Sequence, residues 1–209
     1  MEAELLISFL GASILLALMP GSDNIFVLIQ SLTKGQRDGI AISFGLSCGV
    51  LVHTTLAATG LSIFIKNSDI AFSIIKYLGS AYLFYLAFQA SKEKPITVNL
   101  KGDNSQKDEL FFLIRKGFLM NVLNPKVSLF FIAFLPQFIT PNGFDIMLQM
   151  LILGLIFMIQ SFVVFSFIAI VSGKLTKYLN NSHFWNISKY SKILILSILA
   201  TMLLLSQNY

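Results

Sequence analysis

Residues 10–30 read LGASILLALMPGSDNIFVLIQ, an apolar run interrupted by the polar stretch MPGSDN at residues 19–24. A second apolar run, residues 111–138, is interrupted by NVLNPK at residues 121–126. Each polar stretch contains a proline, which cannot donate a backbone hydrogen bond and so breaks or kinks a helix. Inside a membrane, irregular backbone is tolerated only beside protein or a water-filled cavity. If both runs cross a bilayer, the two breaks predict one internal cavity.

The composition places the chain in a bilayer. Of its 209 residues, 56% are hydrophobic and only 12% are charged, against roughly 25% charged in soluble domains. A single cysteine, Cys48, excludes a disulfide scaffold. The net charge of +5 does not indicate nucleic-acid binding, because Lys and Arg collect in the cytoplasmic loops of membrane proteins. We therefore predict an all-α integral membrane protein.

Six stretches are long and apolar enough to cross a hydrocarbon core of roughly 30 Å. They are residues 5–32, 39–65, 70–91, 111–138, 145–173 and 190–207. The first and fourth would each extend about 42 Å as straight helices, which calls for tilt or interruption. We therefore predict six transmembrane helices, of which the first and fourth are broken at their prolines.

The basic residues predict the orientation. All but three of the 15 Lys and Arg residues lie in or beside the connections after the first, third and fifth spans. Those connections are expected in the cytoplasm, with the N- and C-termini outside. The three exceptions are Lys66, Lys76 and Lys126.

A polar linker, residues 92–110, divides the predicted single transmembrane domain (1–209) into two groups of three spans. An odd number of spans in each group forces the second group to enter the membrane in the opposite orientation. Residues 1–91 and 111–209 are accordingly expected to be inverted repeats joined by a cytoplasmic linker.

Two charged residues stand at the breaks at matching depth. About 16 Å of helix separates Asp23 from Lys34 at the cytoplasmic edge, and about 15 Å separates Lys126 from Lys116. One charge at mid-membrane costs roughly 2.5–3.5 kcal/mol on insertion scales unless it is paired, solvated or neutralised. We therefore expect Asp23 to lie close to the stretch 124–126.

Broken helices at corresponding positions of two inverted halves are the best sequence indicator of a transporter's binding site. We predict that substrate binds between the two breaks, whose helix-interrupting residues are Pro20, Gly21 and Pro125. The binding groups would come from Asp23, Asn24, Asn121, Asn124 and Lys126.

Simpler readings of the polar residues stay open. Asp23 could cap a kinked helix, and Lys126 could extend its ammonium toward an interface. His53 lies near the middle of the second span and titrates near neutral pH, so both Asp23 and His53 are candidate proton carriers. A core histidine bonded to a neighbouring hydroxyl is the alternative for His53.

The chain resembles the LysE/RhtB family of bacterial amino-acid exporters, the lysine exporter and homoserine/threonine exporter group. The resemblance spans the whole chain and rests on the order and spacing of PGSDN (20–24), KG (34–35), KYLGSAYL (76–83), NVLNPK (121–126) and FLPQF (134–138). It implies a multi-pass protein of the cytoplasmic (inner) membrane that expels amino acids or their derivatives by using an ion gradient.

The function predicted from these observations is secondary export of amino acids or amino-acid derivatives, coupled to the proton gradient as an antiport. A cation or metal-ion exporter or channel on the same scaffold is the alternative, because Asp23, Asn24 and Asn121 also suit a cation. We do not expect an enzyme, since the chain has no cysteine pair, nucleophile elbow or His and carboxylate cluster.

The expected partners are a small-molecule substrate and the lipid bilayer, without nucleic acid, cofactor or resident metal ion. Whether the protein forms a homodimer is left open.

Overall fold

The computed structural model describes residues 3–61, 69–93, 108–140, 143–179 and 181–205. Every regular element in those ranges is helical, which confirms the all-α prediction. The elements are α1 (Ala3–Leu18), α2 (Ser22–Lys34), α3 (Gln36–Leu56), η1 (Ala57–Leu61), α5 (Asp69–Ser91), α6 (Leu110–Val122), α7 (Pro125–Leu129), η2 (Phe130–Phe134), η3 (Leu135–Phe138), α8 (Ile146–Leu179) and α9 (Ser182–Leu205).

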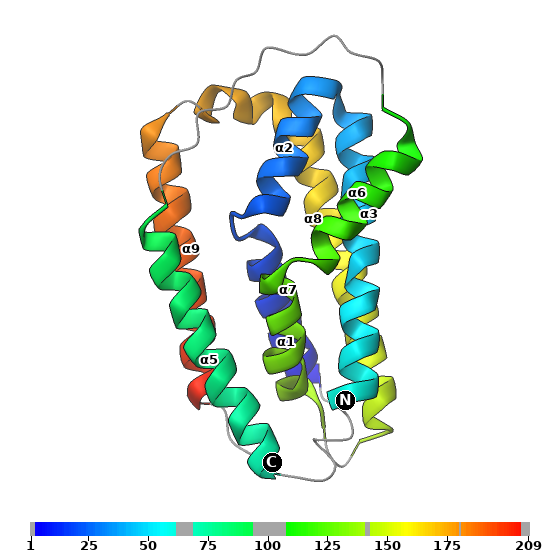
Figure 1. The fold of residues 1–209 in the computed structure, drawn as a ribbon, viewed down its shortest axis with the longest axis vertical. Coiled ribbons are helices and arrows are strands. Elements are labelled where there is room, and N and C mark those ends of the chain that lie inside the picture. Colours follow the sequence, from blue (N-terminus) through cyan, green and yellow to red (C-terminus); the bar gives the residue numbers. More distant parts are fainter. Residues whose placement is uncertain (1–2, 62–68, 94–107, 141–142, 180, 206–209) are drawn as a thin grey trace.

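The first and fourth predicted spans are both broken, as their prolines predict. Helices α1 and α2 meet at an angle of 56°, and α6 meets the segment Pro125–Phe138 at 50°. The α1–α2 pair and the α6–η3 segment run in opposite directions, and their breaks face each other near the middle of the molecule (Figure 1). This antiparallel arrangement is what inverted repeats require, although the full repeat of three and three spans stays a prediction.

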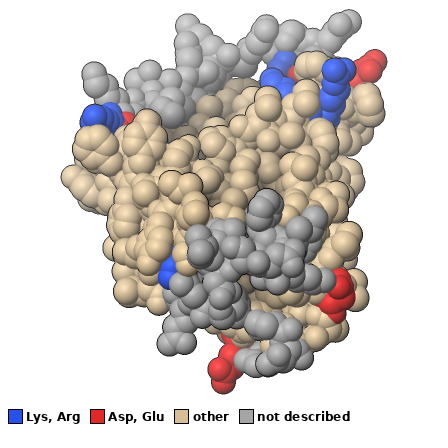
Figure 2. Space-filling view, turned by 60° about the horizontal axis from the view of Figure 1, so that its bottom comes forward, with Lys and Arg blue, Asp and Glu red and all other residues tan. Residues whose placement is uncertain are grey.

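The described helices are those of a multi-pass membrane protein. Three single helices and the two bent pairs are long and apolar enough to cross a bilayer, which gives up to five spans in the described ranges. The predicted third span forms α5 but is not among them. Most of the described surface in Figure 2 is uncharged, with Lys and Arg gathered mainly near its upper edge.

The predicted span at residues 190–207 is wrong at its start. Helix α9 begins at Ser182, because a polar segment can continue a helix beyond the apolar stretch that hydropathy detects. Residues 62–65 of the second predicted span, 206–207 of the last one and 94–107 of the linker lie outside the described residues.

The helices form two groups. The larger group contains α1, α2, α3, α6 and α8, while α5 and α9 pack mainly against each other and stand together on one side (Figure 1). The pair is joined to the larger group chiefly through contacts with α1, α8 and η2. The first residues of α1 and the last of α9 lie at the same end of the molecule (Figure 1).

Glycines allow the closest helix contact in the larger group, between α3 and α6. A Cβ atom added at Gly45 would lie 2.0 Å from the carbonyl oxygen of Ile114, and one at Gly117 would lie 2.3 Å from that of Ile42. Both distances are far below contact, so these positions admit only glycine while the helices stay so close. The contact fixes α6, and with it the start of the second break.

A cluster of phenylalanine rings fills the core beside the breaks, toward the end where α1 begins. Phe130 stacks on Phe134 with ring centroids 5.5 Å apart, and Phe157 lies 5.3 Å from Phe130. Phe9 of α1 packs edge-on against Phe138 at 5.2 Å. All five rings are buried.

Candidate functional site

At the first break, side chains take the place of the missing backbone donors. Pro20 has no N–H to offer the carbonyl of Leu16, and the ammonium of Lys126 donates to that oxygen instead, at 3.3 Å. The next two carbonyls of α1 both accept from Nδ2 of Asn24, at 2.9 and 3.2 Å. Asn24 thus caps the helix that precedes it, and Lys126 from the other broken span completes the cap.

At the second break, the chain supplies its own caps. Pro125 leaves the carbonyl of Asn121 free, and this oxygen accepts from the backbone N–H of Asn124 at 2.8 Å. It also lies 3.1 Å from Nε2 of His53, which donates to it in the tautomer protonated at that nitrogen. The side chain of Asn124 accepts from the N–H of Lys126 at 3.0 Å and so caps α7.

One hydrogen bond joins the two breaks. Nδ2 of Asn124 donates to Oδ2 of Asp23 at 2.6 Å, and the hydroxyl of Ser22 donates to Oδ1 at 3.2 Å. Asp23 is only 1% exposed, and among the described residues these two groups are the hydrogen-bond donors to its carboxylate. The predicted proximity of Asp23 to the stretch 124–126 is therefore confirmed.

Asp23 and Lys126 share a very small inner cavity. Its volume is about 10 Å³, which is at the threshold for a single water. The amide oxygen of Asn121 is buried and has no hydrogen-bond partner among the described residues, and the same holds for the amide oxygen of Asn24. In this conformation, a solute larger than about one water cannot reach Asp23.

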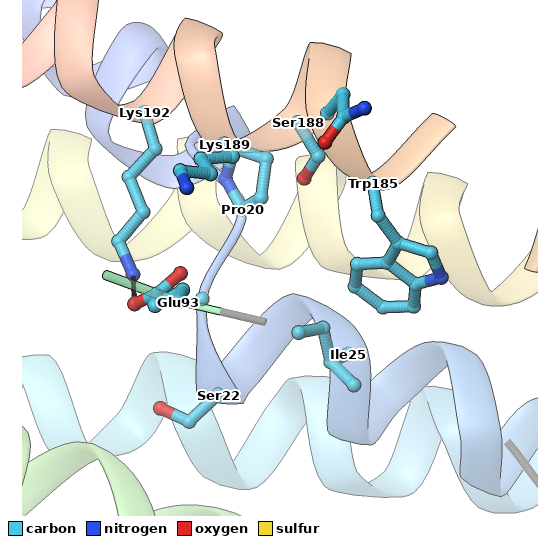
Figure 3. A pocket seen from close by; sticks show the side chains of 10 residues that line it. Pro20, Ser22, Ile25, Glu93, Trp185, Ser188, Lys189 and Lys192 are labelled. Carbon is cyan, nitrogen blue, oxygen red and sulfur yellow. Dashed lines mark hydrogen bonds and ion pairs between the residues drawn. The ribbon is translucent and has the colours of Figure 1, made fainter. Parts of the chain in front are cut away.

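Two larger cavities also border the first break. One has a volume of about 220 Å³ and the other of about 410 Å³. Both are lined by Pro20, Gly21, Ser22, Glu93 and Lys192, so they share a wall. We call them together the outer cavity; Figure 3 shows the part that α9 lines.

Charged groups from three elements face the outer cavity. Lys192 of α9 pairs with Glu93, which lies just after α5, and Figure 3 shows this pair among the side chains that line the cavity. Lys126 lines the smaller part, with Asn124. The first turn of α2 also borders it, and no side chain caps that helix start.

His53 is connected to the breaks but faces elsewhere. A separate cavity of about 440 Å³ is lined by His53 and mainly apolar residues of α3, η1 and η2, among them Leu56, Ala57 and Phe131. His53 is buried, and its partner is the carbonyl of Asn121 rather than the hydroxyl we considered.

The structure thus brings together Pro20, Gly21, Asp23, Asn24, Asn121, Asn124, Pro125 and Lys126, and sequence reasoning missed the α9 side of the site. Trp185, Ser188, Lys189 and Lys192 all line the outer cavity. They recur at intervals of three and four residues, which places them on one face of a helix. That spacing could have revealed the face, had the helix been predicted to begin before residue 190.

Comparisons with known proteins agree on the kind of protein. A family model described as LysE type translocator matches residues 14–207. An uncharacterized membrane protein of Bacillus subtilis (strain 168), YrhP, is 31% identical over 86% of this chain and 88% of its own length. An uncharacterized membrane protein of Vibrio cholerae is 30% identical, over 87% of each chain. No solved structure matches the chain.

Proposed function

Because the chain belongs to the family of LysE-type translocators, we propose that it exports amino acids or amino-acid derivatives from the cytoplasm by antiport with protons. The family makes it a membrane transporter. What we propose beyond this is the class of substrate, the direction of transport and the coupling ion.

The observation that carries the proposal is the hydrogen bond between Asp23 and Asn124, which joins the two broken spans beside the ammonium of Lys126. An amino acid carries an ammonium and a carboxylate. A carboxylate, amides and an ammonium gathered at two helix breaks are the complementary groups. When the breaks move apart, Asp23 and Lys126 become available to these two ends of the substrate.

The position of the outer cavity supports loading from the cytoplasm. The cavity lies between α2, the end of α5 and the first half of α9. These segments border the connections that are rich in Lys and Arg. The positive-inside rule assigns such connections to the cytoplasmic side of the inner membrane. The phenylalanine cluster closes the opposite side, so we describe this conformation as inward-facing.

Asp23 is the proposed proton carrier. It is a buried carboxylate at the contact between the breaks, and the two hydrogen-bond donors that the described residues offer it, Ser22 and Asn124, are uncharged. Protonation would remove the charge that Asn124 and Ser22 now stabilise and so weaken the contact. His53 is the second candidate, since it bonds to the backbone of the other break.

Counterflow in proteoliposomes tests this function. Vesicles loaded with each of the common amino acids are assayed for uptake of the same labelled amino acid. Uptake driven by an imposed pH gradient is then measured. We expect the Asp23→Asn protein to bind its amino acid more weakly but still to exchange it in counterflow at saturating concentration, and to lose its pH-driven accumulation. The matched control is Glu4→Gln, which neutralises an exposed carboxylate of α1 far from the break.

A double variant separates proton carriage from structure. Asp23→Asn combined with Asn124→Asp restores one carboxylate and one amide at the contact and should recover part of the coupling. Wild-type pH-driven transport by Asp23→Asn would overturn the assignment of Asp23. Counterflow of labelled divalent cations without that of any amino acid would overturn the proposed substrate class.

A further inference from the structure

We propose that Glu93 and Lys192 form the first binding site for the substrate's head group, with its ammonium at Glu93 and its carboxylate at Lys192. The proposal rests on the proposed function and deepens it, because it assigns initial recognition to the α5–α9 pair rather than to Asp23.

Access is the first reason. In this conformation Asp23 lines only the inner cavity of about 10 Å³, whereas Glu93 and Lys192 line both parts of the outer cavity, of about 220 and 410 Å³. Their side chains are 50% and 19% exposed, respectively. A solute that enters from this side therefore meets the pair before it can reach Asp23.

The charge of the smaller part is the second reason. It is lined by two ammonium groups, those of Lys126 and Lys192, and by the single carboxylate of Glu93. The uncapped start of α2 adds a partial positive charge on the same side. The excess positive charge suits a carboxylate, and the zwitterion's ammonium replaces Lys192 as the partner of Glu93.

The helix pair does not depend on the ion pair for its packing, which is the third reason. Helices α5 and α9 already bury Leu83, Ala87, Leu196 and Leu199 against each other and the phenylalanine cluster. A partly exposed ion pair contributes little to stability, so its charges are available to a ligand. Binding exchanges one internal ion pair for two contacts with the substrate, so little electrostatic energy is lost when the pair opens.

Substrate analogues distinguish recognition from structure. The probes are the amino acid with the fastest wild-type counterflow, its amide, which lacks the carboxylate, and its analogue without the amino group, each used as a competitor of labelled counterflow. We expect Lys192→Gln to weaken competition by the amino acid and the deaminated analogue at least about tenfold but not to weaken competition by the amide. Glu93→Gln should weaken competition by the amino acid and by the amide, but not competition by the deaminated analogue.

Two further variants complete the experiment. Lys174→Gln, which neutralises an exposed lysine of α8, should leave all three competition constants unchanged. The exchange Glu93→Lys with Lys192→Glu keeps the ion pair but reverses its charges. Full recovery of wild-type constants by this exchange would show a structural pair and overturn the proposal.

The outcomes separate the two proposals. If the wild-type protein shows no counterflow of any amino acid, the proposed function fails and this proposal fails with it. If wild-type counterflow is present and Lys192→Gln changes the competition constants of all three probes equally, or of none of them, only the recognition site is overturned.

Discussion

At the first break, the carbonyl that proline leaves free is bonded by Lys126, a side chain of the other broken span. At the second break, the corresponding carbonyl of Asn121 is bonded by the N–H of Asn124, three residues on, and by His53. The helix that follows the second break is capped by Asn124, whereas no side chain caps the start of α2.

The second break is therefore largely self-supporting, while the first depends on the second. Lys126 and Asn124 both reach across to the first break, and they come from the self-supporting side. Since a transport cycle needs one part to move against another, we expect the first break to be the one that rearranges when substrate binds.

The largest effect is expected for Asn124→Ala. This change removes the cap of α7 and leaves the buried carboxylate of Asp23 without its 2.6 Å donor, so both breaks lose support at once. We expect the free energy of unfolding in mixed micelles to fall by about 2–4 kcal/mol. A loss below about 1 kcal/mol would contradict the dependence of the first break on the second.

A smaller effect is expected for Gly49→Ala, which disturbs the second break alone. The added Cβ would lie 2.7 Å from Cβ of Asn121 and 2.9 Å from the carbonyl oxygen of Phe118. Such overpacking costs about 1–3 kcal/mol, and thermal unfolding in micelles should show it. The matched control is Gly11→Ala, where a Cβ meets nothing within 4 Å; an equal loss at both glycines would show that packing at the break is not the cause.

The smallest effect is expected for Asn24→Ala, which removes the donor to the two carbonyls before Pro20. Hydrogen bonds that side chains make between membrane helices contribute about 0.6 kcal/mol on average. Because two such bonds are lost, we expect the free energy of unfolding to fall by about 1 kcal/mol. Counterflow should be impaired even though the protein stays folded, because only the first break is loosened. Unchanged counterflow with lowered stability would instead place the moving part elsewhere.

The breaks themselves could be predicted from sequence because proline chemistry is local. Pro20 and Pro125 must each leave a carbonyl free wherever the helix lies, and the depth of Asp23 and Lys126 follows from counting residues to the basic edge. The partners could not be predicted. The sequence predicts that Asp23 lies close to the stretch 124–126 but not which of these residues it bonds. In the structure Asp23 accepts from Asn124, and Lys126 donates to the carbonyl of Leu16.

The α9 side of the site could not be predicted from the sequence either, for a different reason. The sequence pattern assigns Lys189 and Lys192 to a basic cytoplasmic connection, and Glu93 to the polar linker. In the structure all three line the outer cavity. Hydropathy detects only the apolar half of α9, because the first half of this helix need not be apolar where it faces a polar cavity.

The sequence by itself determined that this is a helical membrane protein with two spans broken at mid-depth, because apolar length and proline chemistry act within a single segment. Only the tertiary structure decided which side chain satisfies each freed carbonyl and which charges face the outer cavity. Those choices depend on how closely α3 approaches α6 through their glycines and on where the α5–α9 pair stands against the rest. Both are set by packing between segments far apart in the chain.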